Sequence, residues 1–125
     1  MDLGELERAR EIVPVVSVQN RYSISDRESD PVLDRCESDG LAFIPWFPLA
    51  AGRVGGGVID RVAADHDATP FQVALAWLLA RSPAMLPIPG TSSTEHLEDN
   101  IAAASLRLSE DEVAELAASA SAATA

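Results

Sequence analysis

The sequence predicts an α/β fold in which about three parallel strands are flanked by helices. Three short apolar runs, at residues 15–19, 41–49 and 85–88, alternate with segments of helical periodicity. Strands and helices that alternate in this way form βαβ units, whose strands run parallel. The chain of 125 residues is long enough for one domain with a buried core and small for an enzyme barrel.

Composition narrows the class of protein and its partners. Hydrophobic residues make up 47% of the chain and aromatic residues only 5%, which predicts a globular protein with an aliphatic core. The net charge of −11 disfavours nucleic acid and anionic membranes as partners. No apolar run is long enough for a membrane span, and the acidic start at residues 1–5 is unlike a signal peptide, so we expect a cytoplasmic protein. Cys36 is the single cysteine, which excludes an intrachain disulfide and a cysteine metal cluster.

The first part of the chain predicts a helix, a strand and a loop. Residues 3–12 have helical periodicity, and Pro14 stops the helix. Residues 15–19 are rich in β-branched side chains, as expected for a strand covered on both faces. The polar segment 20–28 is predicted to be a solvated loop, because it carries too many hydrogen-bonding side chains for a core.

The next helix begins at Asp30, with Pro31 at its first position, and Gly40 is its predicted C-cap. Its predicted inward face consists of Val32, Leu33 and Cys36. The second strand lies within residues 41–49, with its two prolines at the end of the strand, where the ladder no longer needs every N–H.

Two more helices are predicted in the middle of the chain. Gly52 and residues 55–57 indicate a linker, which leads into a helix that begins at Val58 and ends near residues 65–67. Thr69 caps the following helix, which runs to Arg81 and is so apolar that more than one of its faces must be buried.

The third strand, residues 85–88, leads into a break at Gly90 and a cluster of hydroxyl side chains. Hydroxyls at residues 91–93, just before a helix, are typical of a helix N-terminus that binds anions. Ser92 and Glu95 have the spacing of a capping box, although such a spacing more often marks an ordinary helix start. That helix is expected to reach Ala104.

The last helix is predicted to begin after Ser109, and the Ala-, Ser- and Thr-rich tail from residue 117 onward, including 118–125, is expected to fray.

Few side chains are candidates for chemistry. His66 lies between two aspartates near a helix end and is expected to be a solvated cation, whereas His96 is an open candidate ligand one turn into the anion-binding helix. Trp46 stands at a strand end and is either core or the wall of a pocket. No nucleophile elbow or metal-ligand spacing is found.

Four segments in register resemble the C-terminal part of the aldo-keto reductases. They are residues 18–22 (VQNRY), 44–49 (IPWFPL), 69–79 (TPFQVALAWLL), and 88–92 (IPGTS) together with His96, Asp99 and Asn100. Each segment alone is a weak signal, and together they extend over nearly the whole chain. The resemblance implies a partial (β/α)8 TIM-barrel, made of the last three strands and their helices, over residues 1–125.

The resemblance also implies a site for NADP(H), with NAD(H) as the alternative cofactor. Gln19 would hold the nicotinamide carboxamide, and Trp46 would stack on the nicotinamide ring. The segment from Gly90 onward would hold the 2'-phosphate and adenine. The residues implied in cofactor binding are Gln19, Trp46, Phe47, Leu49, Gly52, Gly90, Thr91, Ser92, His96, Asp99 and Asn100.

Two departures from the family pattern bear on function. Gly90 and His96 stand where many members have Lys and Arg, which weakens the preference for NADP over NAD, although a branch of the family has Gly-Thr-Ser-Ser here. The family's catalytic Asp, Tyr, Lys and His belong to the first half of the barrel, and all nine basic residues of this chain are Arg. The Tyr donates a proton because the adjacent Lys lowers its pKa. We therefore expect no catalytic residue in this chain and no reduction of a carbonyl by the chain alone.

Three hypotheses follow. The chain acts as an oxidoreductase together with an N-terminal half of the barrel, or it is a non-catalytic module that binds nucleotide or associates with a second copy. A gene fragment without function is the third. Three parallel strands leave two open edges, which a second body would cover.

Overall fold

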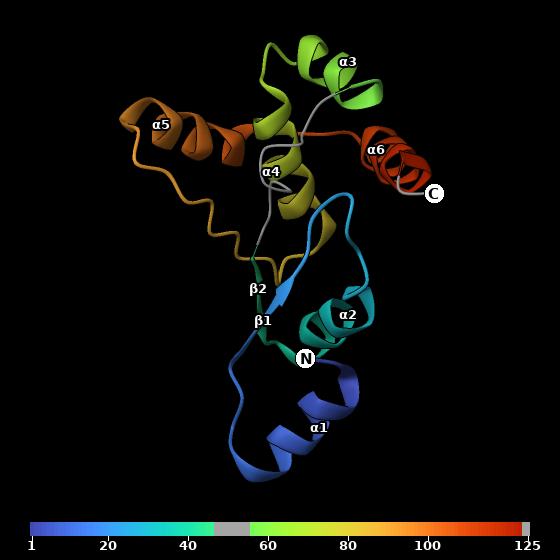
Figure 1. Cartoon of the computed structure of the whole chain (residues 1–125), viewed down its shortest axis with the longest axis vertical. Helices are drawn as coiled ribbons and strands as arrows, with labels where there is room; N and C mark the ends of the chain where they lie inside the picture. The colour runs from blue at the N-terminus through green and yellow to red at the C-terminus, as the bar shows by residue number, and fades with distance from the viewer. Residues whose placement is uncertain (47–55, 124–125) are drawn as a thin grey trace.

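The computed structural model describes residues 1–46 and 56–123 of the chain. Helices and strands alternate through the first part of the chain, and helices make up the second part (Figure 1). The elements are α1 (Leu3–Ile12), β1 (Ser17–Arg21), α2 (Asp30–Asp39), β2 (Ala42–Trp46), α3 (Val58–Asp65), α4 (Pro70–Arg81), α5 (Thr94–Ala102), the 3-10 turn η2 (Ala103–Ser105) and α6 (Glu110–Ala123). No helix among the described residues is long and apolar enough to cross a membrane.

The two strands pair in parallel, with Val18 opposite Phe43, which confirms the predicted parallel α/β fold. A third strand-like segment continues the sheet on the other side of β2, where Phe43 forms a parallel bridge with Met85. The Phe43 amide donates to the Ala84 carbonyl, and the Phe43 carbonyl accepts from the Leu86 amide, both at 2.8 Å.

The third strand predicted over residues 85–88 is reduced to this single bridge. Two residues after Phe43, the next donor in the ladder would be the amide of residue 45. Pro45 lies inside β2 and has no N–H, so it has no hydrogen to offer the Leu86 carbonyl. The prolines were expected at the end of the strand, and Pro45 is the last residue but one of β2. Pro48 lies outside the described residues.

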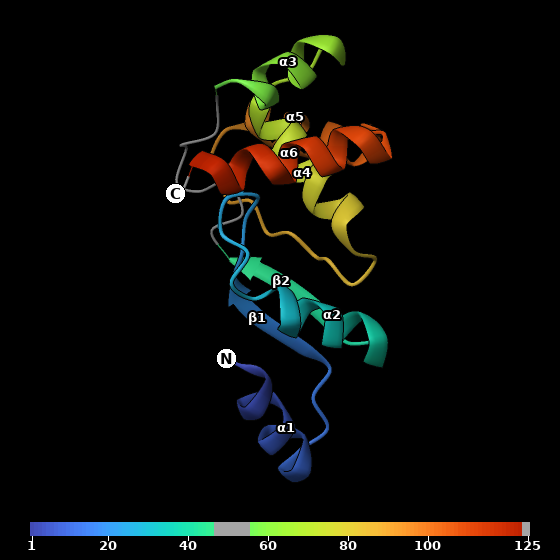
Figure 2. The ribbon, with the colours of Figure 1, turned by 90° about the vertical axis from the view of Figure 1, so that its right-hand side faces the viewer.

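Helix α1 is at one end of the molecule, and α3 to α6 are at the other end (Figures 1 and 2). The strands lie between these ends, with α2 beside them. The core fills the space beside β2, where the Tyr22 ring stacks on Trp77 with 6.4 Å between centroids and meets Phe43 edge-on at 5.5 Å. All three rings are fully buried.

Helix α1 is tied to α2 by charge. The side chains of Arg10 and Arg35 both contact the carboxylate of Asp39, at the C-terminal end of α2. Their hydrogen bonds lower the pKa of Asp39 to about 2, because they stabilise its charged form.

At the end of α2, Gly40 has a φ of 70°, as the predicted C-cap requires.

The most deeply buried helix is α4, as its apolar sequence predicted. Thr69 and Gln72 form a reciprocal capping box at its start, and every residue from Val73 to Leu78 is buried. Helix α6 packs beside it, since the Trp77 indole donates to the Val113 carbonyl at 3.1 Å and Leu116 is buried. Helix α6 extends to Ala123, through most of the segment that we expected to fray.

The segment 20–28 differs from the prediction of a solvated loop. Strand β1 begins and ends two residues later than predicted, and Asn20, Tyr22 and Ile24 are buried. Burial is tolerated because the polar groups have partners: the Asn20 amide donates to the Met1 carbonyl at 2.7 Å and to the Ser29 hydroxyl at 3.1 Å. The polar composition of this segment predicted exposure, because it does not show which distant groups will pair with its side chains.

Candidate functional site

Gln19 and Trp46 lie on the same face of the two-stranded sheet, opposite to the face that packs on the core. Along β1, Val18 and Asn20 are buried while Gln19 is exposed, and along β2 Trp46 is exposed to 44%. The register places Gln19 opposite Ile44, two residues before Trp46. The two side chains are therefore diagonal neighbours at the carboxyl end of parallel strands.

A cavity of about 710 Å³ opens beside this end of the sheet. Gln19, Arg21 and Trp46 line one side of it, and the starts of α1 and α2 line the other. Arg21 stands opposite Trp46 in the register and pairs with Asp26 at 3.0 Å. The sequence interpretation missed Arg21 as a lining residue. Arg21 follows Gln19 by two residues, and residues two apart in a strand point to the same face, so the sequence could have indicated it.

The second predicted half of the site is the loop before α5 and the first turns of that helix. The N-cap is Ser93, whose hydroxyl accepts from the His96 amide at 3.3 Å. The Thr91 hydroxyl in turn accepts from the Ser93 amide at 3.1 Å. The predicted capping box of Ser92 and Glu95 is therefore wrong by one residue, because the helix begins at Thr94.

This arrangement presents an exposed polar surface. Gly90, Thr91, Ser92 and His96 are exposed, and Asp99 and Asn100 are half-buried one turn further along α5. Figure 1 shows α5 standing apart from the strands, so the structure gathers the predicted residues into two groups rather than one. Phe47, Leu49 and Gly52, which the family resemblance also implies in cofactor binding, lie outside the described residues and stay predictions.

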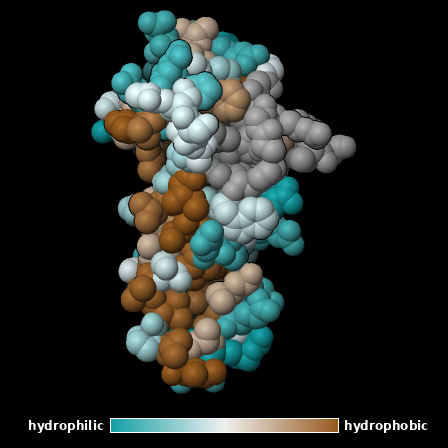
Figure 3. All heavy atoms as spheres, turned by 60° about the vertical axis from the view of Figure 1, so that its left-hand side comes forward, coloured by the Kyte–Doolittle hydropathy of each residue, from teal (hydrophilic) through white to brown (hydrophobic). Residues whose placement is uncertain are grey.

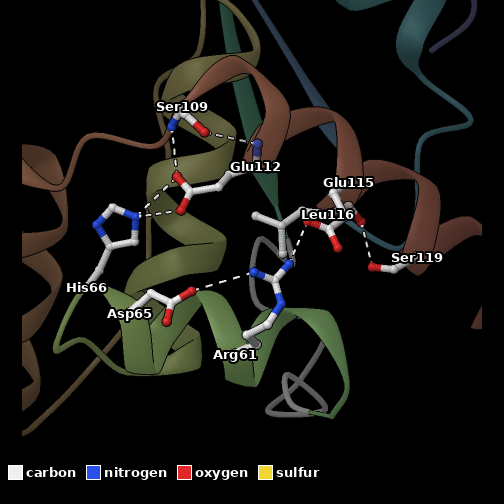
Figure 4. Close-up of polar contacts among 8 residues, drawn as sticks. All are labelled: Arg61, Asp65, His66, Ser109, Glu112, Glu115, Leu116 and Ser119. Carbon is white, nitrogen blue, oxygen red and sulfur yellow. Dashed lines mark hydrogen bonds and ion pairs between the residues drawn. The ribbon is translucent and has the colours of Figure 1, made fainter.

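His66 takes part in a contact between two helices (Figure 4). Its Nε2 lies 2.9 Å and 3.1 Å from the two carboxylate oxygens of Glu112. The Ser109 amide also donates to Glu112, and these bonds lower the pKa of that carboxyl. Nearby, Arg61 of α3 contacts Glu115 at 2.5 Å, so the cluster fastens α6 to α3. The expectation of a solvated His66 was wrong because α6 covers it.

Tyr22 is likewise structural. Its hydroxyl donates to the Asp30 carboxylate at 2.5 Å, and Arg81 of α4 contacts the same oxygen at 3.2 Å. Burial, and then the bond to Asp30, raise the pKa of Tyr22 far above its ordinary value. Tyr22 therefore stays protonated on the core side of the sheet.

No group of three or more metal-ligating side chains is found among residues 1–46 and 56–123.

The arrangement described so far is that of an incomplete β/α barrel with a cavity at the carboxyl ends of its strands. The family model of the aldo/keto reductase family matches residues 1–58 and 56–121. The chain belongs to the aldo/keto reductase family.

Curated relatives are similar over most of this chain. The pyridoxine 4-dehydrogenase of Escherichia coli is 48% identical over 108 residues, which are 86% of this chain and 38% of that protein. An uncharacterized oxidoreductase of Schizosaccharomyces pombe is 47% identical over 116 residues, or 91% of this chain and 38% of that protein. The chain thus spans about two fifths of the length of these relatives.

Solved structures agree in fold. A thermostable aldo-keto reductase in complex with the inhibitor epalrestat has a TM-score of 0.88 at 32% identity, over 94% of this chain and 45% of that chain. An aldo-keto reductase from Klebsiella pneumoniae in complex with NADPH has a TM-score of 0.85 at 28% identity, over 93% of this chain and 44% of that chain. These likenesses confirm the predicted partial TIM-barrel.

Proposed function

We propose that this chain is the cofactor-binding C-terminal part of an NADP(H)-dependent carbonyl oxidoreductase. The observation that carries the proposal is the shared open face of Gln19 and Trp46 beside a cavity at the carboxyl end of β1 and β2. An amide next to an exposed aromatic face suits the carboxamide and the flat ring of a nicotinamide. The Klebsiella pneumoniae relative solved with NADPH supports the same cofactor.

Each predicted residue has a role in this proposal. The Gln19 amide hydrogen-bonds the carboxamide, and Trp46 stacks on the ring. Thr91, Ser92 and His96 bind the 2'-phosphate at the start of α5, where exposed polar groups and the helix dipole favour an anion. Gly90 lets the backbone approach it, and Asp99 and Asn100 contact the adenine. The bound nicotinamide supplies or accepts hydride, and NAD(H) is the weaker alternative.

The chain by itself does not complete the reaction in this proposal. Reduction of a carbonyl needs a proton donor, and the family's Tyr depends on a neighbouring Lys. Residues 1–125 contain no Lys, and their one tyrosine, Tyr22, is buried and bonded to Asp30. The catalytic groups therefore come from residues outside this sequence, in the same polypeptide or in another.

Titration of the purified chain with NADPH tests the cofactor site. We expect saturable binding that Trp46→Ala weakens by about five- to ten-fold, because the stacking contact is lost. Fluorescence is a suitable readout, since Trp46 is exposed and Trp77 is buried. Isothermal titration calorimetry repeats the measurement for the variant, which has lost the reporting side chain.

Ile12→Ala is the matched control, because Ile12 is 82% exposed at the far end of α1. It removes exposed apolar surface without touching the site and should leave NADPH binding unchanged. Absence of binding at millimolar NADPH by folded wild-type chain would refute the cofactor-site proposal.

A second candidate function is a non-catalytic module that associates with a second copy. Large apolar side chains are exposed around the sheet, including Val16 (76%), Leu86 (54%) and Ile88 (50%). Figure 3 shows a face of the molecule on which apolar side chains gather in a band along the long axis. Such a face favours a covering body, which is either the rest of a barrel or another copy of this chain.

A further inference from the structure

Helix α5, which carries half of the residues predicted for the adenosine site, is weakly anchored by its own side chains. None of its residues is buried, and its two large apolar side chains, Leu97 and Ile101, are 50% and 65% exposed. Apolar packing therefore contributes little to the orientation of this helix. Another kind of contact has to fix it.

That contact comes from Gln72, at the start of α4. Its Nε2 donates to the backbone carbonyl of Asp99 at 3.1 Å. Apart from the bonds to the adjoining turn η2, this is the hydrogen bond among the described residues that connects α5 to another element. The same carbonyl also accepts from the Ala103 amide, so it uses both of its lone pairs.

The Gln72 amide is held in place at its other end. Its Oε1 accepts from the Thr69 amide at 3.0 Å, and the Gln72 backbone amide donates to the Thr69 hydroxyl at 3.2 Å. Because the capping box fixes Oε1, the direction of the Nε2 donor toward α5 is also fixed. Residues 73–78 of α4 are buried, so the bond connects a weakly packed helix to a well-packed one.

We propose that Gln72 is the positioning residue of the adenosine half of the site. Gln72 holds α5 so that Thr91, Ser92 and His96 face a 2'-phosphate while the nicotinamide half lies at the sheet. This role rests on the proposed function. It gives Gln72 a role beyond its part in the capping box at the start of α4.

Three variants separate the effect of the Gln72–Asp99 hydrogen bond from the effect of the helix cap. Gln72→Glu keeps an acceptor for the Thr69 amide and loses the donor to the Asp99 backbone carbonyl. The new carboxylate would also repel that carbonyl oxygen. Gln72→Met loses both contacts without adding charge. Thr69→Ala is the matched control, because it weakens the cap and leaves the Nε2 donor in place.

Two measurements are made on the purified chain. Amide hydrogen exchange without ligand reports on α5 itself, and we expect faster exchange over residues 97–102 in both Gln72 variants and not in Thr69→Ala. Calorimetric titration with adenosine 2',5'-bisphosphate reports on the site. We expect binding to weaken by about five-fold in both Gln72 variants, the effect of one hydrogen bond, and to stay within two-fold in Thr69→Ala.

The outcomes separate this proposal from the cofactor proposal. If the wild-type chain does not bind adenosine 2',5'-bisphosphate, both the cofactor site and the positioning role are overturned. If it binds and the Gln72 variants bind equally well, only the positioning role is overturned. Equal weakening in Thr69→Ala would assign the effect to the helix cap and overturn the positioning role as well.

Discussion

At the scale of single residues, buried polar groups carry much of the specificity of this fold. Tyr22 is the clearest case, because its ring packs in the core while its hydroxyl bonds Asp30, which Arg81 also contacts. Three segments distant in the sequence, namely the end of β1, α2 and α4, meet at this point. A partly satisfied network of this kind would be costly, and among the described residues no buried side-chain polar atom lacks a partner.

Replacement of Tyr22 by Phe should destabilise the chain by about 1–2 kcal/mol, because a hydrogen bond to a charged group is lost. The raised pKa of Tyr22 also makes the native state sensitive to alkali. The unfolded tyrosine ionises near pH 10 while the folded one stays protonated, so the free energy of unfolding falls as the pH rises above about 10.

Urea unfolding at about pH 8 and about pH 11 measures this effect for the wild type and for Tyr22→Phe. The variant should lose less stability between the two pH values. Cys36, whose pKa is raised by burial, contributes a fall of the same sign to both proteins and cancels in the comparison. Equal losses in the two proteins would show that Tyr22 does not govern the alkaline response.

At the scale of elements, helix ends follow local rules closely. Three helices begin with a pair of side chains, three residues apart, that form reciprocal hydrogen bonds with each other's backbone amides. The pairs are Asp2 and Glu5 for α1, Thr69 and Gln72 for α4, and Ser109 and Glu112 for α6. These boundaries depend on side chains three residues apart, which the sequence displays directly.

Two glycine substitutions should have opposite effects on stability. Gly40→Ala should cost about 1 kcal/mol, because a Cβ at a φ of 70° is strained although no atom crowds it. Gly4→Ala should stabilise by about 0.5 kcal/mol, because Gly4 lies within α1 and a Cβ there would make only ordinary contacts, the nearest at 3.4 Å. Urea unfolding measures both, and a stabilising Gly40→Ala would contradict the left-handed cap.

At the scale of the whole molecule, one face of the sheet and the edge of β1 lack a covering layer among the described residues. The even-numbered residues of β1 pack on the core, and Gln19 and the other odd-numbered residues face outward. A complete barrel would close both edges of such a sheet. The exposed apolar side chains around the sheet are what that closure would bury.

If no other polypeptide is present, we expect the purified chain to associate with itself through this face. Ile88→Asp should shift the mass in solution toward the monomer, because it places a charge on exposed apolar surface. Ala64→Asp adds the same charge at an exposed position of α3 and should leave the mass unchanged. Light scattering after size exclusion measures the mass, at two salt concentrations because the net charge of −11 opposes association. A monomeric wild type would refute the second-copy candidate.

The candidate site was predictable in part. Gln19 and Trp46 were recognised from short segments, and the parallel register brings them together. Arg21 and Gln72 were missed as contributors, because their roles depend on which side chain stands opposite or across a helix pair. Ser92 was named as the cap instead of Ser93, since neighbouring hydroxyls are equivalent in sequence until the helix start is known.

The sequence by itself determined the order and parallel direction of the elements, most helix boundaries and the family, because these depend on periodicity, caps and short segments. The tertiary structure decided which polar groups are buried, how far the third strand pairs and what holds α5. The sequence predicted exposure for three polar residues that the folded chain pairs with other side chains. The pairs are Asn20 with Ser29, Tyr22 with Asp30, and His66 with Glu112. Burial of a polar group depends on partners brought together by folding, and local composition contains no record of them.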